Sequence, residues 1–132
     1  MAENSILAVD FGNIHTRALL IDRVEGVYQL VARAEERTTG GFPISDVGVG
    51  FRRVVQQLSA ITGRRLLQPD GTLITPEQLD RSGIDAFIAT ASMGRPLRTV
   101  LIGLMPGMSI SSALRSAAGT YVEIVDVISL DD

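Results

Sequence analysis

Residues 8–19 read AVDFGNIHTRAL, and this stretch decides how the rest of the chain is interpreted. The apolar run SILAV at residues 5–9 leads into it and predicts a buried strand that ends at Asp10. A Phe-Gly-Asn turn follows, and Gly12 within it allows the positive φ that tight turns use. The run TRALLID at residues 16–22 then predicts a returning strand. The sequence therefore predicts an antiparallel strand pair with a carboxylate beside its turn.

The residue types of this turn are those of an anion site. Backbone N–H groups of a tight turn can converge on one concavity, and the side chains of Asn13 and Thr16 add hydrogen-bond donors. The Asp10 carboxylate would repel a bound anion, so a divalent cation is needed between them, most simply Mg²⁺ held through water. The alternative is an ordinary hairpin turn, in which Asp10 and Asn13 bond their own backbone while His15 and Arg17 face solvent.

The remainder of the chain alternates predicted strands and helices. The expected strands span residues 5–9, 16–22, 27–33, 84–90, 97–105 and 121–128, and the expected helices span residues 47–62, 75–81 and 109–118. Asp46 and Gly63 are residue types that cap the two ends of a helix, and Pro-Asp-Gly at residues 69–71 is typical of a hairpin turn. The order predicts an α/β, RNase-H-like fold: a mixed sheet that opens with an antiparallel three-strand meander, with helices packed on it.

Composition excludes several classes of function. The 132 residues suggest one domain. They include no cysteine and a single histidine, which excludes a disulfide framework and the usual zinc ligand sets. All 12 basic residues are arginine, so a Walker-A lysine and a Schiff-base lysine are excluded. The net charge of −3 argues against nucleic-acid binding. Without a signal peptide or a long apolar run, the chain is expected to be soluble and cytoplasmic.

The pattern of strand, Asp-x-Gly, polar turn, Thr and returning strand resembles the first phosphate motif of the superfamily of actin, the sugar kinases and the heat-shock chaperone ATPases. Within that superfamily the chain is most similar to the MutL proteins associated with cobalamin-dependent glutamate mutase, which are unrelated to the mismatch-repair protein of that name. The segments that carry the resemblance are ILAVDFGNIHTRALLIDRVEGVYQLVARAE at residues 6–35, LSAITGRRLLQPDGTLITPE at 58–77, ATASMGRPLRTVLIGL at 89–104 and AAGTYVEIVDVISLDD at 117–132.

The resemblance implies that Mg-ATP binds between two lobes and that residues 1–132 are the N-terminal actin-like subdomain of a longer protein. It implies a catalytic role for Asp10, which would orient Mg²⁺ and its water shell. Catalysis in such a site is mostly electrostatic positioning. The implied ATP-binding residues are Gly12, Asn13, Ile14, His15, Thr16 and Arg17. The implied role is that of a chaperone that uses ATP to reactivate glutamate mutase, and the implied partners are the mutase and the second lobe.

The sequence also departs from the family pattern. Asn13 stands where most members have Ser or Thr, His15 adds a ring beside the phosphates, and the second phosphate motif and the adenosine motif are not visible. We therefore expect the isolated chain to bind ATP weakly and to hydrolyse hardly any. The main alternative is a non-catalytic scaffold that keeps the fold without ATP turnover. A nuclease would need carboxylates clustered with Asp10, and only Asp85 and Asp126 are candidates.

Overall fold

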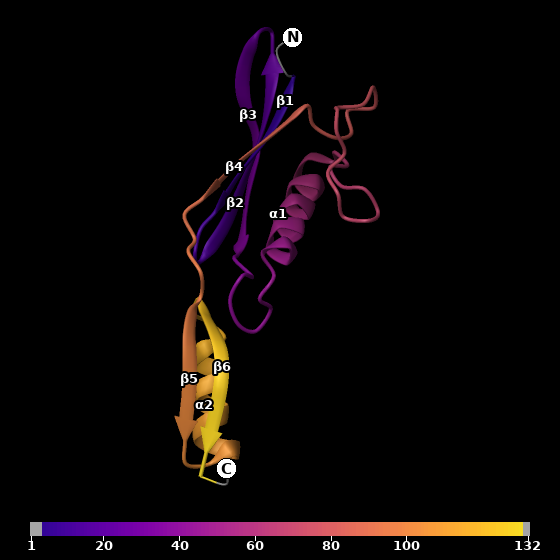
Figure 1. Cartoon of the computed structure of the whole chain (residues 1–132). Helices are drawn as coiled ribbons and strands as arrows, with labels where there is room; N and C mark the ends of the chain where they lie inside the picture. Colours follow the sequence, from indigo (N-terminus) through magenta and orange to yellow (C-terminus); the bar gives the residue numbers. More distant parts are fainter. Residues whose placement is uncertain (1–3, 131–132) are drawn as a thin grey trace.

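The predicted strand pair forms the middle of the first sheet, with one further strand on each side. In the computed structural model, which describes residues 4–130, β1 (Ser5–Phe11) pairs antiparallel with β2 (His15–Val24), and β2 pairs antiparallel with β3 (Val27–Arg37). The predicted meander is therefore confirmed. β4 (Ala86–Ala91) pairs parallel with β1, which gives the strand order β3-β2-β1-β4 (Figure 1). The fold is α/β with a mixed sheet, as predicted.

The core of this sheet lies against one helix, α1 (Val47–Thr62), whose bounds match the prediction. Alternate side chains of a strand point to opposite faces, and the middle of the face of β1 and β2 toward α1 is apolar, with Ser5, Thr16 and Asp22 at its ends. The fully buried residues of this core include Leu7, Leu20, Val54, Val55, Leu58 and Leu66. Both predicted caps are confirmed: the Asp46 carboxylate accepts a hydrogen bond from the Gly48 N–H, and Gly63 ends the helix with φ 70°.

Gly50 lies in the first turn of α1, where the segment that leaves β3 passes so close that a side chain would not fit. A Cβ atom at Gly50 would stand 2.9 Å from the Arg37 carbonyl oxygen and 3.1 Å from the Thr39 hydroxyl. The Gly50 N–H donates to that hydroxyl at 2.8 Å, and the hydroxyl donates to the Asp46 carbonyl oxygen at 2.5 Å. The segment that leaves β3 is thus fixed against the start of α1.

The last two strands form a second sheet, which the sequence did not predict. β5 (Leu97–Gly103) and β6 (Val122–Ser129) pair parallel with each other and with no strand of the first sheet. The π-helical turn η1 (Pro106–Ile110) and α2 (Ser111–Ala117) connect them. One physical factor is the link after β4: residues 92–96 are too few for the crossover of a dozen or more residues that would let β5 lie parallel beside β4.

The region between α1 and β4 is irregular. The predicted hairpin is present around residues 69–71, where Leu67 and Leu73 form an isolated antiparallel bridge. The predicted helix at residues 75–81 is absent, because contacts with distant residues hold this segment in turns, with Arg81 at φ 67°. The Glu77 N–H donates to the Asp85 carboxylate at 3.0 Å, and the neighbouring Gln78 N–H donates to a carbonyl oxygen four residues ahead.

A buried ionic cluster holds this irregular region to β2. The Arg64 guanidinium lies 2.9 Å from the Asp22 carboxylate and 2.8 Å from the Glu77 carboxylate, and all three side chains are less than one-tenth exposed. Arg81 contacts the same two carboxylates from the outer side. One buried carboxylate oxygen of Glu77 has no hydrogen-bond partner within the described chain. Such a cluster fixes one arrangement of the chain more than it adds net stability.

The β5–α2–β6 unit lies beyond one end of the first sheet (Figure 1) and is joined to it at residues 40–42. Cβ atoms at Gly40 and Gly41 would stand 3.2 to 3.3 Å from atoms of Tyr121. The Phe42 N–H donates to the Val122 carbonyl oxygen at 2.7 Å. The accessible surface of the chain is 8345 Å², against roughly 6,700 Å² for a compact monomer of this mass, and this unit accounts for much of the exposed apolar surface.

Candidate functional site

The turn between β1 and β2 is closed by its own backbone and supported by the end of β3. The Gly12 N–H donates to the His15 carbonyl oxygen at 3.0 Å, and a Cβ at Gly12 would stand 2.8 Å from that same oxygen. The Thr38 N–H donates to the Ile14 carbonyl oxygen at 2.9 Å, and the Thr38 hydroxyl donates to the Gly12 carbonyl oxygen at 2.6 Å. The N–H groups of Asn13 and Ile14 have no partner among residues 4–130 and remain available as donors.

Asp10 lies on the face of the sheet that α1 does not cover. The strand register places Asp10 opposite Arg17 on β2 and Thr90 on β4, and it places Arg17 opposite Glu35 on β3. These four polar residues form one row across the sheet. The Thr90 hydroxyl donates to one Asp10 carboxylate oxygen at 2.8 Å, and the other oxygen accepts no hydrogen bond from the described residues. The Asp10 carboxylate thus has one oxygen fixed and one oxygen available.

Arg17 is already neutralised within this row. Its Nε lies 2.5 Å from a carboxylate oxygen of Glu35. The hydrogen bond from Arg17 lowers the pKa of Glu35, and the positive charges of Arg17 and Arg33 act in the same direction. The His15 Nε2 atom lies 3.7 Å from the same carboxylate. Glu35 is therefore charged at neutral pH and holds the guanidinium of Arg17.

Thr16 points away from the surface of the turn. It is fully buried on the α1 side of the sheet, on the same face of β2 as Ala18 and Leu20. Its hydroxyl oxygen lies 3.0 Å from the hydroxyl oxygen of Thr38. The structure thus brings Gly12, Asn13 and Ile14 together at the turn and leaves Thr16 as an anchor beneath it.

A pocket of about 380 Å³ lies against the tip of this turn. It is lined by Asn13, Ile14, Arg37, Thr38, Gly41, Phe42, Ala118, Gly119, Thr120 and Tyr121, and we call it the junction pocket. One wall comes from the turn and the end of β3, and the opposite wall comes from the β5–α2–β6 unit. Neither Asp10 nor Arg17 lines it. Sequence reasoning missed Arg37 and Thr38, because the third strand was expected to end at residue 33 rather than at Arg37.

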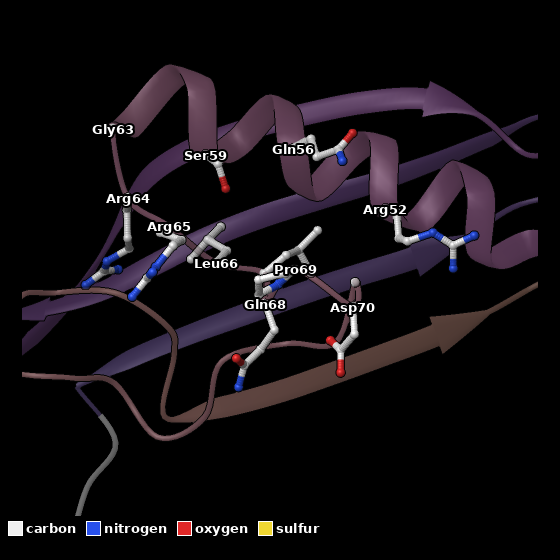
Figure 2. A pocket seen from close by; sticks show the side chains of 12 residues that line it. Arg52, Gln56, Ser59, Gly63, Arg64, Arg65, Leu66, Gln68, Pro69 and Asp70 are labelled. Carbon is white, nitrogen blue, oxygen red and sulfur yellow. The ribbon is translucent and has the colours of Figure 1, made fainter.

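A larger hollow of about 740 Å³ lies far from the turn, between α1 and residues 64–71 (Figure 2). Arg52 and Asp70 lie toward one end of it, and Arg64 and Arg65 lie toward the other. Its buried cation, Arg64, is already paired with two carboxylates. Size alone therefore does not locate the site, and the chemistry of the turn is the better guide.

The carboxylates that a nuclease would need are not gathered at Asp10. Asp85 precedes β4 and lies at the opposite end of the sheet, where backbone N–H groups of Asn4 and Glu77 lower its pKa. Asp126 lies on β6 in the other sheet. Among residues 4–130 no three His, Cys, Asp or Glu side chains are grouped to hold a metal ion. Asp10 alone suits Mg²⁺ only where phosphate oxygens and water supply the other ligands.

Comparisons with known proteins give one family match. A family model described as MutL protein matches residues 6–132. Protein MutL of Clostridium tetanomorphum is 27% identical over 131 residues, which cover 97% of this chain and 23% of that protein. The chain thus spans about a quarter of the length of the curated relative that it matches.

Two solved structures from Aquifex aeolicus are also similar. The PPX-GPPA enzyme is 11% identical with a TM-score of 0.38, over 97% of this chain and 36% of that one. A crystal structure of the Ppx/GppA family member is 10% identical with a TM-score of 0.36, over 98% and 36%. Within the described residues, no helix is long and apolar enough to cross a membrane.

Proposed function

The chain belongs to the MutL protein family, and from this premise we propose that it forms the N-terminal lobe of an actin-like protein that binds Mg-ATP. The observation that supports this most is the position of Asp10. It lies at the carboxyl end of β1, directly beside the carboxyl end of the parallel strand β4. Ligands of open α/β sheets bind outside the carboxyl ends of their parallel strands.

In this proposal the turn binds the phosphates through its backbone. The free N–H groups of Asn13 and Ile14 donate to phosphate oxygens. Gly12 allows the turn to close on the His15 carbonyl oxygen, and Thr16 anchors it through the Thr38 hydroxyl. Arrangements of this kind stabilise the charge that develops during phosphoryl transfer without covalent chemistry.

Asp10 has the geometry of a residue that orients a hydrated cation. Thr90 fixes one carboxylate oxygen, and the other accepts no hydrogen bond from the described residues. A bound Mg²⁺ would supply charge neutralisation for the phosphates. Asp10 would hold the water shell of the ion and thereby fix its position.

The proposal also covers the longer protein to which this lobe would belong. We expect a second lobe from the longer protein to close over the nucleotide, since this chain spans 23% of its curated relative. We propose that the longer protein is an ATP-driven chaperone that reactivates a cobalamin-dependent glutamate mutase in the cytoplasm, and membership of the MutL protein family is what supports this role. The isolated chain, which contributes one lobe only, would bind ATP weakly and hardly hydrolyse it.

A scaffold without ATP turnover is the second candidate function, and two observations favour it. The Thr16 hydroxyl is buried, and the Arg17 guanidinium is held by Glu35. Neither group is free to bind phosphate as the family pattern expects. A scaffold of this kind would need only the fold and its partner surface.

Phosphate release from Mg-ATP by the longer parent protein separates the two candidates. We expect Asp10→Asn to reduce turnover by about 100-fold or more, as removal of one preorganised electrostatic group does elsewhere. Asp126→Asn is the matched control, since Asp126 lies on the other sheet, and it should leave turnover unchanged. Absence of turnover in the folded wild type with nucleotide in excess would support the scaffold instead.

A further inference from the structure

We infer that Arg37 is the residue that neutralises the phosphate chain of the nucleotide, from its place in the junction pocket. This inference rests on the proposed function of the turn and goes beyond it, because Arg37 belongs to no part of the phosphate motif. It assigns the junction pocket to the phosphate groups of a nucleoside triphosphate.

The first support is a difference between two arginines. Arg17 is the cation that the motif itself supplies, yet its guanidinium is paired with Glu35. Arg37 is exposed and forms no ion pair with any residue in the range 4–130. An anion that reaches the turn therefore meets one neutralised arginine and one arginine with its full charge available.

The second support is the fixed position of Arg37 relative to the turn. Arg37 is the last residue of β3 and stands opposite His15 in the strand register. The next residue, Thr38, donates both its N–H and its hydroxyl hydrogen to carbonyl oxygens of the turn. The backbone of Arg37 thus cannot move away from the turn without breaking these bonds.

The third support is the pocket between them. Asn13, Ile14 and Arg37 all line it, so the two residues with free N–H groups and the unpaired arginine border the same space. Its volume of about 380 Å³ lies within the range of small-molecule sites. A guanidinium is suited to phosphate because its planar fork donates two parallel hydrogen bonds to phosphate oxygens.

Calorimetric titration of the 132-residue chain tests this inference, with Mg-ATP and with magnesium tripolyphosphate as two probes. We expect Arg37→Gln to weaken the binding of both probes about tenfold or more, as loss of a hydrogen bond to a charged group does. Arg37→Lys should restore part of the affinity, because it restores the charge but not the fork. Loss of affinity for tripolyphosphate shows that Arg37 acts on the phosphates rather than on the base.

Arg33→Gln is the matched control, since Arg33 lies on the same strand, is exposed, and lines no part of the junction pocket. It should change the affinity less than about twofold. A wild-type chain that binds neither probe contradicts the proposed function and this inference with it. Binding by the wild type that Arg37→Gln leaves unchanged, or that only Arg17→Gln weakens, overturns the inference alone. Thermal unfolding of each variant confirms that it is folded.

Discussion

The four-stranded sheet and the β5–α2–β6 unit are built from similar apolar strands, yet they bury their side chains very differently. The four-stranded sheet and α1 together make the first body, in which Leu7, Leu20 and Leu58 are completely buried. Among the described residues of the β5–α2–β6 unit, one apolar side chain is buried, that of Ile110. Ile102 on β5 is 78% exposed. Parallel strands usually lie in sheets with both faces covered. The strands β5 and β6 instead leave apolar side chains exposed.

The difference shows where the stability of the chain resides. The first body has a helix with two caps, a continuous core and a buried ionic cluster. In the second unit η1 contacts both strands, the short helix α2 has no buried residue, and the unit is joined to the first sheet by contacts around Tyr121. We expect the first body to determine the unfolding transition and the second unit to open more easily.

Arg64→Ala should have the largest effect on the free energy of unfolding. It would leave the Asp22 and Glu77 carboxylates buried with only Arg81 as partner. Breaking a buried pair in this way costs about 3–5 kcal/mol, which chemical denaturation would measure. The neighbouring exposed residue provides the control: Arg65→Ala should stay within about 0.5 kcal/mol. Equal effects of the two variants would show that the cluster does not hold residues 64–82 to β2.

The comparison of the two regions is tested most directly by a pair of truncations. Leu58→Ala removes a fully buried side chain and should cost about 2–5 kcal/mol. Ile102→Ala removes a side chain of similar size that is mostly exposed and should cost less than about 1 kcal/mol. Comparable losses from the two variants would mean that β5 and β6 are as well packed as the first sheet.

The junction between the regions should respond to a smaller change. A Cβ at Gly41 would stand 3.3 Å from backbone atoms of Tyr121 and Val122, so Gly41→Ala should push the two bodies apart at a cost of about 1 kcal/mol. Hydrogen exchange of the Phe42 amide, which donates across the junction, should become faster. Gly107→Ala is the control, because its added Cβ meets no atom within 4 Å. An equally large acceleration of Phe42 amide exchange in Gly107→Ala would contradict this prediction.

The smallest expected effect is a change in how the free energy of unfolding depends on pH in the acid range. The pKa of Glu35 is lowered from 4.5 by the hydrogen bond from Arg17. A carboxylate with a depressed folded pKa adds stability above its unfolded pKa, and this stability is lost as the pH falls through the folded value. Denaturation at a series of pH values below about 4.5 should therefore show a steeper decline for the wild type than for Glu35→Gln. Identical declines would show that the Arg17–Glu35 pair is not formed in solution.

Local signals in the sequence predicted local structure well. The helix at residues 47–62 was predicted at both ends, because its caps Asp46 and Gly63 act within one turn of the helix. The helix expected at residues 75–81 failed for a non-local reason: Glu77 pairs with Arg64, and its N–H pairs with Asp85. Strand periodicity likewise cannot tell which sheet a strand joins, so the separation of β5 and β6 was missed.

The sequence predicted the position of the turn after β1, whereas the roles of its residues are untested. Strand alternation places Thr16 on the same face as Leu20, so its burial was readable from the sequence although its hydroxyl was expected to bind phosphate. The roles of Asp10 and of residues 12–17 stay predictions. Arg37 carried no local signal, because its place beside the turn depends on the length of β3 and on the register between β2 and β3.

The central claim is that nucleotide phosphates bind at the turn after β1. Amide chemical shifts of the ¹⁵N-labelled chain, followed during addition of Mg-ATP, test it residue by residue. The account predicts that the largest shifts occur at Asn13, Ile14 and Thr38, and that Asp10→Asn weakens them. Shifts confined to the hollow between α1 and residues 64–71 (Figure 2), or no shifts at all with nucleotide in excess, would contradict it.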